Sequence, residues 1–545
     1  MKIVVIGAVA AGTSAAAKAR RNNDQAEIVI YERDQHISYS GCGLPYYIGS
    51  EVKDIDELTP RNPAFFKKKY NVDIFTGHEV LAIDTTLKQI QVENLASGEV
   101  FTDSYDKLIL ATGASAFRPN ITGVDLAHVF FLRNVRNALA IKDFMKSQKP
   151  KTAVIAGTGF IGFELLENLM HENIDVTIVE MADKITPNLD SDMASFLENT
   201  LIKQGIKVLK STQIVKIERD GVVLSDGKIL LADMVIMATG VRPNVELAKK
   251  AGVKLGSTGA IAVSTTMQTN LPDVYACGDC IETYSLITRK AVYRPLGSTA
   301  NKTGRIAGDS ITGGSLTYRG NLGTGIFKLF QMTIASTGLS EREARSEGLE
   351  VVICHNIKPN KPEYMGGKEM VIKAVAEKST GRLLGVQIIG EDGVDKRIDV
   401  FATLITYKAT VEELFHLDLA YAPPFSTTKD PVHYTGMILD NAIHQGRPLI
   451  TADELGDIGE DVQIIDARSR EDFEMKGHVE QAVSISHAEL RATLPTLDKD
   501  KVTVTYCNKG VTGNAAQNIL LGNGFKKVYN LSGGHKFYKG GKLNG

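Results

Sequence analysis

A single cysteine, Cys42, lies between two glycine-rich turns, and this combination indicates thiol chemistry coupled to dinucleotide binding. The turns span residues 7–12 and 157–162, and an acidic residue follows the start of each by about 20 to 25 positions, Glu32 and Glu180. Glycine lets a pyrophosphate approach the free amides of a helix N-terminus, and the acidic residue binds two ribose hydroxyls. The layout predicts a flavin site, a nicotinamide site and a reactive thiol.

The turns require strands to position them, and apolar runs supply these at residues 2–6 and 152–156. The first turn has Ala8 and Val9 where a second glycine is usual, so further support is needed. It comes from residues 105–113, which are typical of a strand ending in a Thr-Gly turn, and from Asp279, which follows a strand and a glycine. The residues expected to bind FAD or NADH are Gly7, Ala10, Ala11, Gly12, Glu32, Arg33, Val80, Ala111, Thr112, Gly113, Gly157, Gly159, Phe160, Ile161, Gly162, Glu180, Gly240 and Asp279.

Together these segments resemble the two-dinucleotide-binding flavoprotein disulfide reductases over about the first 440 residues. The resemblance implies an α/β protein with two Rossmann-like domains and an α+β dimerisation domain, assembled as a homodimer. The expected boundaries are 1–118 and 243–320 for the FAD-binding domain, 119–242 for the NAD-binding domain, 321–440 for the dimerisation domain, 441–457 for a linker and 458–545 for a last α/β domain.

The last domain carries a second reactive cysteine. Residues 462–468 predict a buried strand that ends in an Asp-x-Arg pair, and the predicted strand 502–506 leads directly into Cys507. This segment resembles a rhodanese domain, in which a loop folded around the cysteine points amides at the sulfur and stabilises a thiolate or persulfide. Such loops usually carry an arginine three to five residues after the cysteine, whereas Lys509 is the only cation of the loop 507–513.

Residues 38–49 give the most specific indication of chemistry. Reductases with paired cysteines would show two here, and this chain has only Cys42, whose disulfide must form with a small thiol or an oxidised form of itself. The segment resembles the coenzyme A disulfide reductases, which implies that Cys42 is the redox-active nucleophile. We expect a helix N-terminus and the flavin to lower the pKa of this thiol. Related NADH oxidases and peroxidases carry a histidine in the first phosphate loop, where this chain has Ala10, so oxygen chemistry lacks its proton donor.

The resemblance also assigns residues that bind coenzyme A, whose phosphates require cations. The expected substrate-binding residues are Ser14, Lys18, Arg21, Ser38 and Lys429. Lys67 to Lys69 form a charge run that we interpret as a solvated helix face. Two tyrosines of the partner subunit reach the active site in the family; here they match Tyr421 and Tyr364, although Met365 replaces a neighbouring family tyrosine.

The nicotinamide turn carries an aromatic residue and an acidic residue that predict its specificity. Phe160 matches the family's aromatic gate over the flavin. Glu180 would repel a 2′-phosphate, which favours NADH over NADPH. Cys277 and Cys280 have C-x-x-C spacing, but they flank the Asp279 turn and are expected to serve packing, and no metal site is expected.

Composition limits the remaining classes of function. The net charge is −2, which gives no reason to expect nucleic acid, and no apolar run approaches membrane-spanning length. The odd number of cysteines, 5, favours a reducing compartment such as the cytoplasm.

These observations lead to the hypothesis of an FAD-dependent NADH reductase of coenzyme A persulfide, polysulfide or disulfide, fused to a rhodanese domain. The fusion favours persulfide, because a sulfur-carrying loop adds nothing to disulfide reduction. Three alternatives remain open: a sulfurtransferase that the flavoprotein half merely resets, an NADH oxidase or peroxidase, and a redox sensor.

Overall fold

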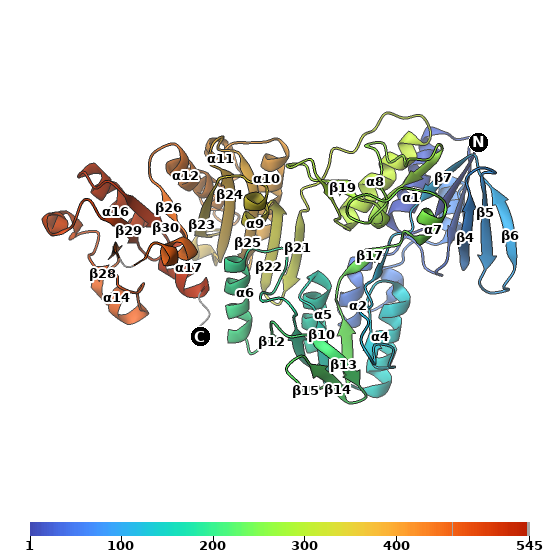
Figure 1. Cartoon of the computed structure of the whole chain (residues 1–545), viewed down its shortest axis with the longest axis horizontal. Coiled ribbons are helices and arrows are strands. Elements are labelled where there is room, and N and C mark those ends of the chain that lie inside the picture. The colour runs from blue at the N-terminus through green and yellow to red at the C-terminus, as the bar shows by residue number, and fades with distance from the viewer. Residues whose placement is uncertain (460, 542–545) are drawn as a thin grey trace. The chain divides into compact units, whose positions relative to one another are not determined.

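The computed structural model describes residues 1–459 and 461–541. These residues form two compact units, one of Met1–Asp183 with Lys207–Gly323 and one of Lys184–Ile206 with Thr324 onward. Figure 1 labels many of the elements of each unit. Among the described residues, none of the helices combines the length and apolar character that crossing a membrane requires.

A parallel sheet carries the first glycine-rich turn. Its strand order is β18-β7-β1-β2-β3, and most side chains of its apolar strands are buried. The strands are β1 (Lys2–Ile6), β2 (Glu27–Glu32), β3 (Asp73–Thr76), β7 (Lys107–Leu110) and β18 (Val274–Ala276). Helices α1 (Ala10–Asn22) and α8 (Gly297–Ser310) approach closely, since a Cβ at Gly304 or Gly308 would collide with the backbone of α1.

A second parallel sheet, inserted between β7 and β18, carries the second turn. Its order is β12-β11-β10-β16-β9. The strands are β9 (Val129–Phe130), β10 (Thr152–Ala156), β11 (Asp175–Val179), β12 (Lys207–Leu209) and β16 (Met234–Met237), and the helices beside them are α4 (Val135–Gln148) and α5 (Phe160–His171). The pairing of β18 with β7 confirms that the first sheet resumes after the insertion.

Smaller elements complete the first unit. The strands β4-β5-β6 and β13-β14-β15 form two antiparallel three-stranded sheets, and β8 pairs with β17. The bounds are α2 (Leu44–Ile48), α3 (Pro63–Tyr70), β4 (His78–Asp84), β5 (Gln89–Asn94), β6 (Val100–Ser104), β8 (Ala114–Ala116), β13 (Ile214–Glu218), β14 (Gly221–Leu224), β15 (Ile229–Leu231), β17 (Val241–Pro243), α7 (Glu246–Lys250), β19 (Thr283–Tyr284) and β20 (Ala291–Val292).

The second unit begins with an antiparallel sheet of order β21-β22-β25-β24-β23. Its elements are β21 (Gly325–Leu329), β22 (Met332–Gly338), α9 (Glu341–Ser346), β23 (Val351–Pro359), β24 (Glu369–Glu377), β25 (Leu383–Gly390), α10 (Val394–Thr406), α11 (Val411–Phe415) and α12 (Pro431–Ile443). Helix α6 (Ser191–Lys203), which the sequence places inside the 119–242 domain, belongs to this unit. Its Asp192 binds the buried Lys373 of β24 at 2.9 Å, and this ion pair ties the helix to the sheet.

The last sheet is parallel, in the order β26-β30-β29-β27-β28. Its elements are β26 (Leu449–Ile450), α13 (Ala452–Asp457), β27 (Val462–Asp466), α14 (Arg470–Lys476), β28 (Val483–Ser484), α15 (Leu490–Thr493), β29 (Val502–Tyr506), α16 (Val511–Gly522), β30 (Val528–Leu531) and α17 (Gly534–Gly541). The segment 441–457, expected to be a linker, supplies the edge strand β26, because Leu449 and Ile450 pair with β30. The expected boundary at 458 therefore falls inside the last fold.

Candidate active site

The two glycine-rich turns have the same backbone geometry. Gly7 and Gly157 both have a φ of 106°, and the N–H of each donates to the carbonyl at the end of the neighbouring strand, Tyr31 or Val179, at 2.9 Å. A Cβ at either glycine would collide with a backbone carbonyl. Only glycine fits both the left-handed conformation and the close approach.

Each turn is held by its acidic residue. Glu32 Oε2 accepts the Ala8 N–H at 2.8 Å, and Glu180 Oε2 accepts the Thr158 N–H at 2.9 Å. Burial raises the pKa of Glu32. A carboxylate has lone pairs beyond those used here, so each side chain can hold the turn and still accept from ribose hydroxyls.

A cavity of about 780 Å³ opens beside the first turn. Its lining contains the predicted residues Gly7, Ala10, Ala11, Glu32, Arg33, Val80, Ala111, Thr112, Gly113 and Asp279. Gly12 is not part of the lining. Because it has no side chain, α1 can pack against the Gly7 carbonyl. The volume lies within the range usual for cofactor sites, roughly 300–1,000 Å³, and the turn geometry fits a dinucleotide phosphate.

The sequence analysis missed two residues of this cavity. Arg133 donates to Asp279 at 2.6 Å, and Asn244 donates its side-chain N–H to the Thr112 carbonyl at 2.8 Å. Neither belongs to a local motif, so only the folded chain reveals them. Asp279, expected to accept from a flavin, is thus also fixed by a protein cation.

Cys42 lies in a 3₁₀ turn, Gly41–Gly43, immediately before α2, and its side chain is exposed. Partial desolvation and then the carboxylate of Glu164 raise the pKa of the thiol, while Arg133 acts in the opposite direction. The expectation of a lowered pKa is therefore wrong for the protein's own groups. Helix α2 has only five residues, Leu44–Ile48, and its dipole is weak beside a nearby carboxylate.

Glu164 is a further site residue that the sequence analysis missed. It lies one helical turn after Phe160 on α5, and burial followed by the neighbouring Glu167 raises its pKa to about 7. A carboxyl group with this pKa exchanges a proton near neutral pH, which is typical of functional sites.

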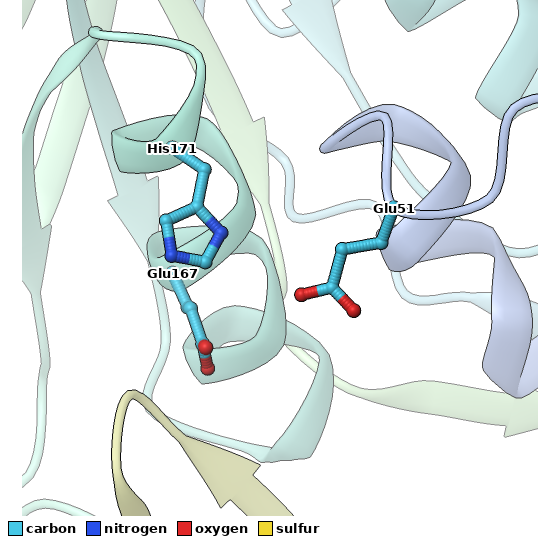
Figure 2. Close-up of side chains that lie close together, drawn as sticks. All are labelled: Glu51, Glu167 and His171. Atoms are coloured by element: carbon cyan, nitrogen blue, oxygen red, sulfur yellow. The ribbon is translucent and has the colours of Figure 1, made fainter.

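Glu167 belongs to a polar cluster with Glu51 and His171, shown in Figure 2. One ligand atom of each side chain lies within 4.8 Å of the others. Glu51 and His171 are exposed, and acidic groups at a surface commonly meet without an ion, so we assign no metal here. The cluster affects the site through Glu167, which raises the pKa of Glu164.

The predicted coenzyme A residues of the first unit gather mainly on α1. Ser14, Lys18 and Arg21 are spaced to share one helix face. Lys18 pairs with Asp309 at 2.9 Å, so its charge is already partly balanced. Ser38 has a φ of 49° and donates its N–H to the Ala8 carbonyl at the edge of the first turn.

The remaining lysines considered in the sequence analysis lie at the protein surface. Lys67 pairs with Asp73 at 2.8 Å, and Lys69 lies 5.3 Å from the centre of the Phe65 ring, consistent with a solvated face of α3. Lys429 is exposed and belongs to the second unit.

The nicotinamide turn leads into α5, with Gly159 at the N-cap and Phe160 as the first helical residue. Ile161 and Gly162 follow in the first turn, and Gly240 has a φ of 97°. Cys277 and Cys280 are fully buried, and burial raises the pKa of both thiols, as a packing role predicts.

The two predicted tyrosines lie in the second unit. Tyr421 is 48% exposed and lines a cavity of about 630 Å³ together with Arg397 and Asp392. Tyr364 is 76% exposed in the 3₁₀ turn Glu363–Met365. Both side chains are accessible to another molecule.

Cys507 follows β29 directly and is buried. The Gly510 N–H donates to its Sγ at 3.2 Å, and the His535 N–H donates to its carbonyl at 2.9 Å. The predicted Asp-x-Arg pair is present, and Arg468 forms an ion pair with Asp466 at 2.6 Å. The loop thus presents an amide to the sulfur, as predicted.

Comparisons with known proteins match the whole length of this architecture. Residues 1–294 match the pyridine nucleotide-disulphide oxidoreductase model, residues 325–431 its dimerisation domain, and residues 451–540 the rhodanese-like domain. These matches confirm the predicted α/β class and its domain types.

Two of the similar curated proteins come from archaea. An NADH oxidase of Methanocaldococcus jannaschii is 38% identical over 79% of this chain and 97% of its own length. A CoA-dependent NAD(P)H sulfur oxidoreductase of Pyrococcus furiosus is 38% identical over 80% of this chain and 99% of its own length.

Solved structures extend the similarity to the last domain. Reduced CoADR-RHD of Bacillus anthracis matches with a TM-score of 0.96 and 36% identity over 99% of this chain and 98% of its own. A NAD-dependent persulfide reductase of A. fulgidus matches with a TM-score of 0.91 and 38% identity over 98% of this chain and 100% of its own. The family implies FAD and a pyridine nucleotide as cofactors. This chain belongs to the pyridine nucleotide-disulphide oxidoreductase family and ends in a rhodanese-like domain.

Proposed function

We propose that this protein is an FAD-dependent NADH reductase of coenzyme A persulfide or polysulfide, which also accepts coenzyme A disulfide, and that its rhodanese domain delivers sulfane sulfur. The observation that carries the proposal is the presence in one chain of an exposed thiol, Cys42, and a loop-held thiol, Cys507. The names of the similar sulfur oxidoreductase and persulfide reductase support it.

Cys42 is coupled electrostatically to the cavity proposed for the flavin. Arg133 and Asp279 line that cavity, and the charges of both act on the Cys42 thiol. When bound there, FAD would supply two electrons drawn from NADH to a disulfide at Cys42. Because the described residues hold no second cysteine beside Cys42, the disulfide is formed with the substrate.

The reaction at Cys42 follows from this arrangement. The Cys42 thiolate attacks the inner sulfur of coenzyme A persulfide (CoA–S–SH), the bond between the two substrate sulfurs breaks, and HS⁻ leaves. The product is a mixed disulfide between Cys42 and coenzyme A. Two electrons and one proton then convert the mixed disulfide to coenzyme A thiol and the Cys42 thiolate. Glu164, with a pKa of about 7, is the group on α5 that can hold that proton.

Recognition of the substrate and of NADH rests on charge. Ser14, Lys18 and Arg21 present hydroxyl and cationic groups on one face of α1, which suits the phosphates of coenzyme A. The carboxylate of Glu180 disfavours a 2′-phosphate, so NADH is preferred. The dimerisation domain supports a homodimer, in which Tyr421 and Tyr364 would reach the partner's site.

Two cysteine substitutions test the proposal, with NADH oxidation as the measurement. Cys42→Ser is expected to abolish turnover of coenzyme A persulfide and to retain FAD, whereas unchanged turnover would exclude Cys42 as nucleophile. Cys507→Ala is expected to preserve turnover of soluble coenzyme A persulfide and to impair the use of polysulfide. Cys354→Ala, which removes a buried thiol of β23, is the matched control.

The rival functions predict different results in the same assays. An NADH oxidase would consume oxygen rapidly without any sulfur compound, but Ala10 gives the cavity wall no proton donor. A sulfurtransferase would transfer sulfur from thiosulfate to cyanide independently of NADH. A redox sensor would show no steady-state turnover with any sulfur acceptor.

A further inference from the structure

Two lysines at the Cys507 loop share one carboxylate of the dimerisation domain. Lys509 belongs to the loop itself and Lys536 belongs to α17, and both form ion pairs with Glu369 of β24. The three side chains are between 32% and 44% exposed, so a small solute can reach them. Two ammonium groups and one carboxylate leave one net positive charge beside the loop.

Backbone contacts place both lysines against the reactive segment. Lys509 lies between Cys507 and Gly510, whose N–H donates to the Cys507 Sγ at 3.2 Å. The N–H of Lys536 donates to the carbonyl of Asn508 at 3.0 Å. Both ammonium groups are therefore carried by residues that form the loop or bind its backbone.

Glu369 is negatively charged in this arrangement. Burial raises the pKa of its carboxyl group, but the hydrogen bonds and charges of Lys509 and Lys536 outweigh burial and lower the pKa overall. Each carboxylate oxygen accepts a hydrogen bond from one of the two ammonium groups. Glu369 thus occupies donors that an oxyanion would otherwise receive, and it cancels half of the positive charge that would attract one.

Sulfane-sulfur donors differ in what these lysines can bind. Thiosulfate carries negative charge on its sulfonate oxygens, which accept strong charge-assisted hydrogen bonds from ammonium groups. Polysulfide carries its charge on sulfur, which is a weak acceptor. A carboxylate that engages both lysines therefore weakens the binding of thiosulfate more than the binding of polysulfide.

We propose that Glu369 of the dimerisation domain determines the donor specificity of the rhodanese domain: by pairing with Lys509 and Lys536, it selects polysulfide over thiosulfate as the donor to Cys507. The inference rests on the proposed role of Cys507 as a sulfur carrier. With thiosulfate, the Cys507 thiolate attacks the outer sulfur, the S–S bond breaks and sulfite leaves. With polysulfide, the thiolate attacks the terminal sulfur, and a polysulfide that is shorter by one sulfur leaves. Either reaction converts the thiolate to a persulfide anion and conserves the total charge.

The first test compares the loading of Cys507 by the two donors in the full-length holoenzyme. Persulfide formation on the Cys507 peptide is followed by mass spectrometry, with thiosulfate and with polysulfide in separate reactions. Glu369→Gln, which keeps the size of the side chain and removes its charge, is expected to raise the thiosulfate-to-polysulfide rate ratio roughly three- to tenfold. This gain should shrink in about 1 M salt, where the screening length falls to about 3 Å. Equal ratios in the wild type and Glu369→Gln would overturn the inference.

Two further variants separate the charge at this position from other effects of substitution. Glu377→Gln is the matched control, because Glu377 ends the same strand, is also partly exposed and loses the same charge. Its ratio should equal that of the wild type. Glu369→Asp keeps the charge and should also stay near the wild-type ratio. A gain in either variant as large as that of Glu369→Gln would contradict the inference, because the effect would then depend on neither the position nor the charge.

A second measurement is independent of sulfur transfer. The Cys507 peptide is alkylated by anionic iodoacetate and by neutral iodoacetamide at one pH, and Glu369→Gln is expected to raise the ratio of the two rates roughly threefold. An unchanged ratio would contradict the inference, because a merely structural change would alter both rates alike. Failure of the wild type to load from either sulfur donor would instead contradict the proposed function, while the alkylation ratio would still decide whether Glu369 acts on anions that approach Cys507.

Discussion

Glu164 raises the pKa of the Cys42 thiol, although the two residues come from separate helical segments of the first unit. Glu164 itself has a pKa of about 7. Its negative charge therefore develops over the same pH range in which an enzyme thiol must become nucleophilic. The carboxyl group favours the thiol form of Cys42 above neutral pH and does so less below it.

This relationship predicts the behaviour of Glu164→Gln. The amide cannot ionise, so the pKa of Cys42 falls, and alkylation of the Cys42 peptide by iodoacetamide at pH 8 becomes several-fold faster. Wild-type protein should show an additional inflection near pH 7 that the variant lacks. Glu99→Gln, at an exposed position in the loop before β6, is the control. Identical profiles in wild type and Glu164→Gln would show that the carboxylate does not act on the thiol.

The two glycine-rich turns predict selective losses of cofactor. A Cβ at Gly12 would collide with the Gly7 carbonyl, and a Cβ at Gly162 would collide with the Gly157 carbonyl. Gly12→Ala is expected to release FAD, measured by absorbance of the purified protein. Gly162→Ala is expected to retain FAD and to raise the KM for NADH at least about tenfold, the result of about 1.4 kcal/mol of lost binding. Gly522→Ala, with open space around the new methyl group, should change neither value.

The buried Lys373 predicts a large effect on stability. Its ammonium binds Asp190 at 3.3 Å, Asp192 at 2.9 Å and Glu341 at 2.8 Å. Lys373→Met leaves three carboxylates without their cation and should lower the free energy of unfolding by about 3–5 kcal/mol. Urea denaturation, followed through the unfolding transition of the second unit, would measure this free energy. Lys378→Met, at the exposed lysine that directly follows β24, is the control, and a loss no larger than that of this control would mean that the network contributes little.

The same network predicts a dependence on acid. Burial raises the pKa of Asp192, but the His355 hydrogen bond and Lys373 outweigh it and hold the pKa well below its usual range. The native state consequently binds fewer protons than the unfolded state below pH about 4, the ordinary pKa of aspartate. The stability that Asp192 contributes is present above that pH and is lost progressively as the pH falls from there toward the lower pKa of the native state. Denaturation at pH 6, 5, 4 and 3 should show this decline, and Asp192→Asn should flatten it.

Local sequence patterns predicted the strands and the turns, whereas the reactivity of Cys42 and Cys507 stays a prediction. The strands at 2–6, 152–156 and 502–506 agree with the structure at both ends, because apolar runs bounded by glycine or charge fix them locally. Glu164 could not be predicted. It raises the pKa of Cys42, which is distant in the chain, and only the packing of α5 near α2 creates this pair.

Helix α6 illustrates the same limit. The expected bounds 119–242 place it within the NAD-binding domain, but Asp190 and Asp192 carry the charges that bind Lys373 of β24. The sequence does not show which distant lysine the acidic residues at the start of a helix will bind. The ion pairs with Lys373, which only the folded chain reveals, connect α6 to the sheet of the second unit.

The mass of the Cys42 peptide, measured after the holoenzyme reacts with one equivalent of coenzyme A disulfide in the absence of NADH, is the sharpest test of Cys42 as the nucleophile. The expected product is a mixed disulfide of coenzyme A with Cys42, which NADH then removes with release of coenzyme A thiol. A disulfide between two cysteines of the chain, or a Cys42 peptide that stays unmodified while NADH is still oxidised, would contradict it.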